Sequence, residues 1–321
     1  MRRHFFHTIS ALPILATGLM ASAQAPAPPS LDVRLARHVH QVASVEHNTS
    51  KPATLEDAAT YIETTLAALG YSVKRQQYAY VGHMVRNLEV SLINSAGKKP
   101  PERIFIVGAH VDCAPGAPGA NDNGSSTAAV LELARMLRGI HLGQGTELKF
   151  VFFVNQEPSY FSGAGVSRWQ HATDLHQRGQ PGAAALILET PGSPSQAKGR
   201  QPPPPGLEKI YPNQGNFIAF VGTQASSEMV RKALAAFKAA SPFAAEGLAA
   251  ASYVEGVTWS GQPSYNRYGY PAIMVTDTAF LRYPYYHTGQ DTPAKLDYAS
   301  MARVVEGLAK VIEAIAAPTR M

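Results

Sequence analysis

The sequence predicts a single α/β domain in which a mixed, mostly parallel central sheet lies between layers of helices. Short, continuous apolar runs recur along the chain, which is typical of strands that are buried on both faces. Segments with helical periodicity separate these runs, and that alternation favours a parallel sheet covered by helices. With 321 residues, 45% of them hydrophobic, the chain is long enough for one large core.

The expected strands and helices follow one another from the first third of the chain to its end. The apolar runs that predict strands are residues 104–107, 148–154, 185–188, 217–221 and 272–275. The segments that predict helices after them are residues 125–137, 226–239 and 299–316. Residues 191–215, which contain four consecutive prolines, are expected to form a long loop within the domain.

An amphipathic helix is predicted over residues 54–69, ahead of these strands. Thr54 followed by Asp57 resembles a capping box, and Gly70 supplies the stop. Residues 71–80 and 87–93 alternate between apolar and polar side chains, which predicts a pair of half-buried antiparallel strands.

Residues 1–25 are typical of a secretory signal peptide. Arg2 and Arg3 give the segment a positive start, and residues 9–20 are apolar. Small residues suited to cleavage follow, as Ala21-Ser22-Ala23 or Ala23-Gln24-Ala25. An uncleaved anchor is the less favoured alternative, because the apolar run falls short of the roughly 20 residues that span a bilayer. We therefore expect residues 26–321 to form the functional domain, periplasmic or secreted, with no stable membrane association after cleavage.

Charge and cysteine content exclude several classes of protein. The formal net charge is +5, and removal of Arg2 and Arg3 leaves +3, with no basic cluster of six or more residues anywhere in the chain. Nucleic acid is therefore not expected as a partner. Cys113 is the only cysteine, which excludes internal disulfides and a cysteine-based zinc cluster. We expect Cys113 to be a small buried side chain rather than a nucleophile.

Five side chains with metal-ligand chemistry follow four of the predicted strands: His110, Asp122, Glu157, Glu189 and His287. Functional residues of such sheets gather beyond the carboxyl ends of the strands. Imidazole and carboxylate together suit zinc, and three protein ligands would hold one catalytic ion. Five ligands suit two ions about 3.5–4 Å apart if one carboxylate bridges them. Asp122 fits the bridge because it lies in a glycine-flanked turn, and Asp112 could orient His110 by accepting a hydrogen bond from its ring.

Five short motifs carry these residues: GAHVD at 108–112, PGANDNGSS at 118–126, FFVNQEP at 152–158, LETPG at 188–192 and YYHTGQDT at 285–292. Together they resemble the zinc aminopeptidase family that includes bacterial leucyl aminopeptidases, aminopeptidase Y, glutamate carboxypeptidase II and glutaminyl cyclases. The resemblance covers nearly all of residues 26–321. It implies one zinc peptidase-like domain with a mixed sheet between helices, two zinc ions and peptide substrates.

The family pattern also implies a role for each ligand. It makes His110 a ligand of one ion, with Glu189 in the place of that ion's acidic ligand. Asp122 takes the place of the bridge between the ions. Glu157 and His287 then hold the second ion.

Two departures from the family pattern bear on catalysis. Active members carry two adjacent glutamates after the strand at 148–154, the first of which is the general base, whereas this chain has Gln156-Glu157. A carboxamide forms hydrogen bonds, but it cannot take a proton from water and return it to the leaving amine. Near residue 260, related sequences commonly have Ser-Asp-His where this chain has Ser260-Gly261-Gln262.

Three functions are compatible with these residues. The first is an exported zinc-dependent exopeptidase that removes amino-terminal residues from peptides. The second is a catalytically impaired relative that binds zinc, because Gln156 stands at the general-base position. The third is an aminoacyl cyclase, which family kinship alone suggests. Among the other polar residues, Tyr283, Tyr285 and Tyr286 are expected to pack around the metal loop, and a place in a substrate pocket or beside an oxyanion is the less favoured alternative. His171 is expected to be solvated.

Overall fold

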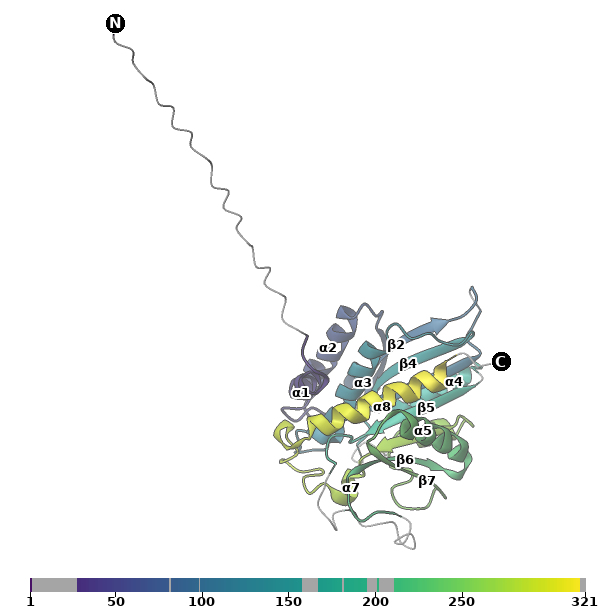
Figure 1. Ribbon diagram of the computed structural model, residues 1–321. Helices are drawn as coiled ribbons and strands as arrows, with labels where there is room; N and C mark the ends of the chain where they lie inside the picture. The colour runs from purple at the N-terminus through teal and green to yellow at the C-terminus, as the bar shows by residue number, and fades with distance from the viewer. Residues whose placement is uncertain are drawn as a thin grey trace.

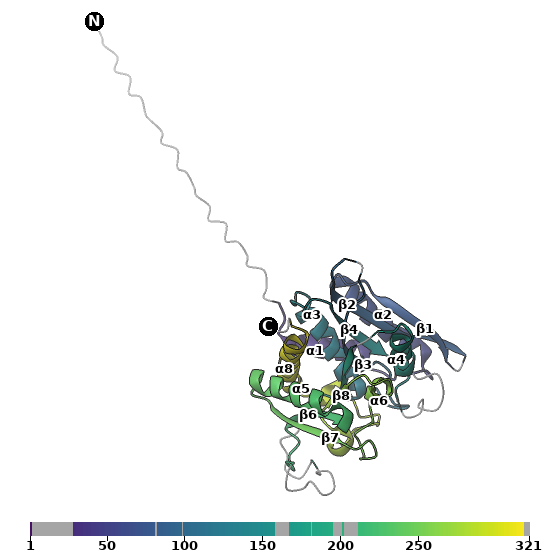
Figure 2. The same ribbon diagram turned by 90° about the vertical axis from the view of Figure 1, so that its right-hand side faces the viewer.

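Eight strands form one mixed sheet in the computed structural model of the chain, and helices pack on both of its faces (Figures 1 and 2). The structure describes residues 1, 28–80, 82–97, 99–157, 167–180, 182–194, 201 and 211–317. The strands are β1 (Lys74–Tyr80), β2 (His83–Asn94), β3 (Arg103–His110), β4 (Thr146–Phe153), β5 (Ala183–Glu189), β6 (Phe217–Thr223), β7 (Ala244–Ala250) and β8 (Ala272–Thr276). The helices are α1 (Leu31–Val42), α2 (Pro52–Ala68), α3 (Ser126–Met136), α4 (Ser167–Gln177), α5 (Ser227–Ala240), α6 (Gln262–Asn266), α7 (Ala279–Arg282) and α8 (Tyr298–Ala316). Apart from Met1, the predicted signal peptide lies outside the described residues, as does most of the loop expected at 191–215.

The strand order across the sheet is β1-β2-β4-β3-β5-β8-β6-β7. At the centre, β4, β3, β5 and β8 run parallel to one another. Antiparallel pairing joins β1 to β2, β2 to β4 and β6 to β8, whereas β7 runs parallel to β6 at the other edge. The prediction of a single α/β domain with a mixed, mostly parallel sheet is confirmed.

The main hydrophobic core lies between one face of the sheet and the helices that cover it, which are α1, α2, α3, α5 and α8. In Figure 1, α8 is drawn in yellow and runs across this face. On the opposite face, α4 and α6 cover a smaller core that contains Ile106, Ile187 and Tyr265. All residues of β8 are buried, in keeping with the continuous apolar run that predicts this strand. None of the helices in the described part of the chain is long and apolar enough to cross a membrane.

The helix expected from Thr54 onward starts two residues earlier. It begins at Pro52, whose ring presets the backbone angle and whose missing N–H needs no partner in the first turn. The capping box is wrong, because the Thr54 hydroxyl donates to the main-chain carbonyls of Glu46 and Lys51 instead. Gly70 ends the helix as predicted, with φ at +83°.

Five of the helices and strands named above have no counterpart in the sequence prediction: α1, α4, α6, α7 and β7. The sequence of β7, AAEGLAA, lacks the β-branched and aromatic residues that are typical of strands. It becomes a strand because it pairs with β6 along its whole length. Tertiary contacts likewise hold α1, since Arg34 and His38 both reach Glu132 of α3.

Glu132 is the centre of a buried ion-pair cluster between α1 and α3. Its carboxylate lies 3.0 Å from Nε of Arg34, 3.1 Å from Nε2 of His38 and 2.7 Å from Nε of Arg135. Burial by itself raises the pKa of Glu132, but hydrogen bonds from His38, Arg135 and Arg34 outweigh it and lower that pKa to about 2.

We expect Glu132→Gln to lower the free energy of unfolding at neutral pH by about 1.5–3 kcal/mol, the range of hydrogen bonds to charged groups. Because folding lowers the pKa of Glu132 from 4.5 to about 2, its contribution is complete above pH 4.5 and is lost as the pH falls toward 2. Urea unfolding of the wild type and the variant at pH about 7 and about 3 measures this contribution. The difference between the two proteins should shrink at the lower pH, and a constant difference would contradict the assignment.

Candidate metal centre

The carboxyl ends of the central parallel strands meet at one edge of the sheet, and the predicted site residues lie there. His110 is the last residue of β3, and Glu189 is the last residue of β5. Glu157 follows β4, and Asp122 lies in a buried turn that leads into α3. His287 lies in the loop after α7. The structure therefore brings all five predicted ligands to one cavity of about 320 Å³.

The five side chains form two clusters that share Asp122. In the His110 cluster, Nε2 of His110 lies 3.1 Å from Oε1 of Glu189 and 3.5 Å from Oδ1 of Asp122. In the His287 cluster, Nε2 of His287 lies 2.9 Å from Oδ2 of Asp122 and 3.2 Å from Oε2 of Glu157. The two oxygens of Asp122 thus face two different imidazoles.

The spacing and chemistry of these atoms fit divalent metal ions. Zinc bonds of about 2.0–2.2 Å in a tetrahedral site place neighbouring ligand atoms roughly 3.3–3.5 Å apart, close to the distances within both clusters. Although Nε2 of His287 lies near the oxygens of Asp122 and Glu157, it is not in hydrogen-bond geometry with them; it and Oε1 of Glu157 are two of the nine buried side-chain atoms without a hydrogen-bond partner in the described part of the chain. His110, Asp122 and Glu157 offer ligand atoms that all lie within 4.8 Å of one another.

Burial and mutual charge shift the pKa values in this cavity. Burial by itself lowers the pKa of His287, but Asp122 and Glu157 outweigh it and raise that pKa to about 10. Burial and the charge of Asp122 raise the pKa of Glu157 to about 8. Burial also raises the pKa of Glu189. Buried carboxylates at such close range require positive charge beside them, which either protons or metal cations can supply.

Four non-glycine residues around this edge of the sheet hold left-handed backbone conformations: Asn155 (φ 56°), Thr190 (φ 52°), Thr278 (φ 60°) and His287 (φ 57°). Asn155 directly precedes Gln156, and Thr190 directly follows Glu189. Such conformations cost on the order of 1–3 kcal/mol each and concentrate at functional sites. Their clustering is independent support for a functional role of this edge.

Comparison with known proteins identifies the family. The model of peptidase family M28 matches residues 91–312, which is more than half of the chain. The chain belongs to peptidase family M28. The resemblance that the five motifs predict is thereby confirmed.

The relatives of this M28 chain include uncharacterized protein YfbL of Escherichia coli (strain K12), which is 32% identical over 263 residues, or 79% of this chain and 78% of the relative. Among solved structures, an aminopeptidase from Aneurinibacillus sp. strain AM-1 matches with a TM-score of 0.69 and 14% identity over 90% of this chain and 95% of that one. A glutaminyl cyclase from Fimbriiglobus ruber matches with a TM-score of 0.62 and 18% identity, over 88% and 94% of the two chains. At these identities, the structural matches establish the fold alone.

Gln156, which the sequence resemblance places at the general-base position, lines the cavity that contains the five predicted ligands, called the metal cavity below. Its main-chain N–H donates to Oδ2 of Asp112 at 2.9 Å, and the N–H of Glu157 donates to the same oxygen at 3.4 Å. The Asp112 carboxylate therefore anchors the segment after β4. The ring of His110 meets the main-chain carbonyl of Asp112, 2.9 Å from Nδ1, whereas the carboxylate Oδ1 is 3.6 Å away. Any orientation of His110 by Asp112 thus runs chiefly through the main chain.

Tyr286 has the location of the less favoured of its two expected roles, a place in the wall of the cavity. It lines the metal cavity, and its ring stacks on that of His287 with 3.9 Å between the centroids. Burial, followed by the charge of Asp122, raises the pKa of Tyr286 well above its ordinary value. The phenol therefore keeps its proton, and the Asp122 carboxylate is within reach as its hydrogen-bond acceptor.

The segment near residue 260 supports the cavity without supplying an ionisable group. The Ser260 hydroxyl donates to Oε2 of Glu189 at 2.6 Å. Gln262 is fully buried, and its side chain donates to the main-chain carbonyl of Val257 at 2.7 Å. A Cβ on Gly261 would lie only 3.3 Å from the side chain of Ile187. Gly261 and Gln262 therefore serve packing here, where the family pattern has an acid and a histidine.

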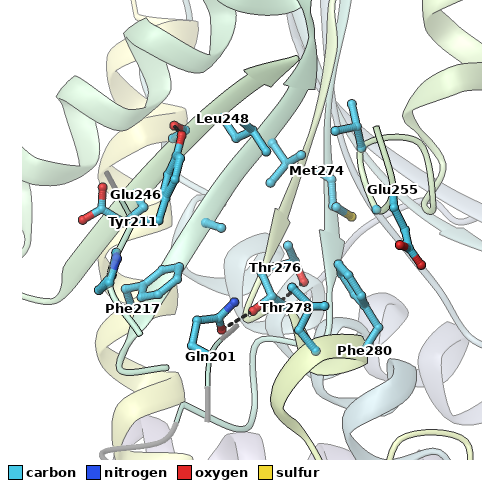
Figure 3. A pocket seen from close by; sticks show the side chains of 17 residues that line it. Gln201, Tyr211, Phe217, Glu246, Leu248, Glu255, Met274, Thr276, Thr278 and Phe280 are labelled. Atoms are coloured by element: carbon cyan, nitrogen blue, oxygen red, sulfur yellow. Dashed lines mark hydrogen bonds between the residues drawn. The ribbon is translucent and has the colours of Figure 1, made fainter. Parts of the chain in front are cut away.

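A second, apolar cavity adjoins the metal cavity of this M28 chain, and Figure 3 shows the side chains that line it. Met274 of β8 and Phe280 of α7 line both cavities. In Figure 3 they lie along one side, opposite Tyr211 and Phe217. Trp259, whose ring centroid lies 4.8 Å from that of Phe280, adds to the wall of the metal cavity. The metal cavity therefore has an apolar wall beside its ligands.

Cys113 is a free, buried cysteine, as predicted. Burial raises the pKa of its thiol to about 12, so the thiolate is not populated at neutral pH. Its sulfur accepts a hydrogen bond from the main-chain N–H of His47 at 3.1 Å. These contacts give Cys113 a packing role.

Proposed function

We propose that this chain is an exported zinc-dependent exopeptidase of the aminopeptidase type, which removes amino-terminal residues from peptides. Membership of family M28 and the aminopeptidase fold support a peptidase. The observation that carries the metal assignment is the placement of Asp122, whose two oxygens face two different imidazoles. We assign one zinc ion to the His110 cluster and a second to the His287 cluster, with Asp122 shared between them.

The other residues of the cavity can bind water and substrate, but neither Gln156 nor Tyr286 replaces the general base. Zinc, when bound, lowers the pKa of a coordinated water toward about 7 and polarises a carbonyl group. Gln156 can hold a water molecule or the substrate by hydrogen bonds, but it can neither take up nor release a proton at neutral pH. Tyr286 can donate a hydrogen bond to a carbonyl oxygen of the substrate. Because general acid–base catalysis contributes about 10²–10⁴-fold, we expect turnover to be slow.

The apolar wall of Met274, Phe280 and Trp259 favours substrates whose first residue has an apolar side chain, such as leucine. We also propose that residues 1–25 are removed as a signal peptide and that residues 26–321 act in the periplasm or outside the cell. The positive start at Arg2 and Arg3 and the small residues at 21–25 support this location.

Hydrolysis of leucyl and alanyl anilides by the mature chain, with added zinc and after removal of metal by a chelator, tests the proposal. We expect slow release of the aniline that depends on zinc and is faster for the leucyl compound. A rate no higher than that of the metal-stripped protein would overturn the assignment of activity. The zinc content of the same preparation gives the number of ions per chain.

A catalytically impaired relative that binds zinc is the second candidate, and Gln156 is the observation that favours it. Gly261 and Gln262 point the same way, because they stand where related sequences carry ionisable residues. This candidate predicts zinc binding without zinc-dependent hydrolysis in the wild type. It also predicts that hydrolysis appears once a carboxylate stands at position 156.

A further inference from the structure

Asp291 is a fully buried carboxylate beside the turn that carries Asp122. Its Oδ1 accepts a hydrogen bond from the main-chain N–H of Asn121 at 2.8 Å, and its Oδ2 accepts one from the N–H of Asp122 at 3.1 Å. The hydroxyl of Tyr283 donates to Oδ1 at 2.9 Å. Buried main-chain N–H groups require an acceptor, and Asp291 supplies one to two consecutive residues of the turn.

Asp291 also joins the two segments that meet in the His287 cluster. It lies four residues after His287, and its own N–H donates to the carbonyl of Thr288 at 3.0 Å. Its main-chain carbonyl accepts a hydrogen bond from the N–H of Ala120 at 3.1 Å. The loop with His287 and the turn with Asp122 are therefore connected through one residue. These segments place Nε2 of His287 2.9 Å from Oδ2 of Asp122.

We propose that Asp291 is a positioning residue that holds the Asp122 carboxylate between the two clusters and thereby sets zinc affinity, above all at the His287 cluster. This inference rests on the proposed zinc-dependent function. A carboxylate suits the position because both of its oxygens accept hydrogen bonds and neither donates one. An asparagine would turn an NH₂ group toward the N–H of Asn121 or Asp122. The turn would then shift, and the Asp122 carboxylate would no longer face both imidazoles.

Asp297 provides a matched comparison in the same part of the chain. Its carboxylate accepts a hydrogen bond from the N–H of Ser300 at 3.0 Å and so caps the start of α8. Loss of a helix cap lowers stability, but it removes no contact to the turn that carries Asp122. Asp297→Ala therefore separates a loss of stability from a loss of positioning.

Zinc affinity of the mature chain, measured by competition with a chelator of known affinity, tests the inference on the wild type, Asp291→Asn and Asp297→Ala. Residues that orient metal ligands typically change metal affinity by about 10–100-fold. We expect Asp291→Asn to bind zinc about 10–100 times less tightly than the wild type. Asp297→Ala should bind zinc like the wild type while it unfolds at a lower temperature.

Wild-type zinc affinity in a folded Asp291→Asn protein would overturn the inference, and so would an equal loss of affinity in Asp297→Ala. A wild type that binds no zinc would instead show that the proposed function is wrong. If Asp291→Asn does not fold, Tyr283→Phe replaces it, because this change removes one hydrogen bond to Oδ1 and keeps both main-chain contacts. We then expect zinc affinity to fall about two- to tenfold, and an unchanged affinity would refute the role of Asp291.

Discussion

The Gln156→Glu variant is expected to hydrolyse leucyl anilide with a kcat/KM about 10²–10⁴ times that of the wild type. The backbone at this position is already anchored, since its N–H donates to Asp112 at 2.9 Å, and the side chain lines the metal cavity. A carboxylate there can take a proton from water and pass it to the leaving amine. The gain corresponds to about 3–5.5 kcal/mol of activation free energy, at 1.36 kcal/mol for each factor of ten.

This substitution also places a further negative charge near Asp122, Glu157 and Glu189. Repulsion between these carboxylates should lower the stability of the metal-free chain and strengthen zinc binding. Initial rates at saturating zinc, together with melting curves with and without zinc, measure both effects. Gln156→Ala is the matched control, because it removes the carboxamide without adding a base, and its rate should not exceed that of the wild type.

The outcome separates the two candidate functions. A wild type that hydrolyses the anilide as fast as Gln156→Glu would exclude the impaired relative. A wild type without zinc-dependent hydrolysis, followed by clear hydrolysis in the variant, would identify a disabled peptidase site. A variant that binds zinc and remains inactive would count against the aminopeptidase assignment.

The Asp122→Asn variant is expected to bind zinc much more weakly than the wild type. The loss should exceed the roughly 10–100-fold that is typical when a residue that only orients a metal ligand is replaced. A carboxamide carries no charge and has one acceptor oxygen, whereas both oxygens of Asp122 face imidazole nitrogens at 3.5 and 2.9 Å. In the variant, one cluster therefore faces an NH₂ group in place of an oxygen, and the other faces an oxygen that carries no negative charge. Zinc content after dialysis, together with the zinc-induced rise in melting temperature, measures the loss.

Stabilisation by a bound ligand grows with its concentration relative to Kd, to about 2.7 kcal/mol at 100 times Kd. We expect the wild type to show such a rise with zinc and Asp122→Asn to show little or none. Asp174→Asn is the control, since this acid on α4 lines a different cavity. If Asp122→Asn retained the zinc content and affinity of the wild type, the bridging assignment would be wrong.

The strands that hold the site could be predicted because burial on both faces leaves unbroken apolar runs in the sequence. His110 and Glu189 end two of these strands, and Glu157 follows a third. The ends of parallel neighbours lie at one edge of a sheet, so order along the chain was enough to predict that these side chains meet. The sharing of Asp122 was expected from its glycine-flanked turn and from the family pattern, whereas its distances to the two imidazoles come from the structure.

Residues whose roles depend on distant contacts could not be predicted in this way. Asp291 acts on a turn 170 residues earlier in the chain, and no local pattern records that contact. His171 lies among polar neighbours and was wrongly expected at the surface. It is buried, with Nε2 2.9 Å from Glu89 and Nδ1 2.9 Å from the hydroxyl of Tyr265. An amphipathic pattern indicates which side of a helix is buried, but it does not indicate which distant residues form hydrogen bonds with a polar side chain on that side.

A carboxylate shared between two imidazoles makes the two halves of the site thermodynamically dependent on each other. A cation that arrives at one oxygen of Asp122 changes the basicity of the other oxygen, and the coupling free energy is the same whichever half fills first. On the proposed two-ion assignment, a chain with one ion bound would be a distinct species, with its own affinity for the next ion and its own number of bound protons. One average binding constant would describe neither half.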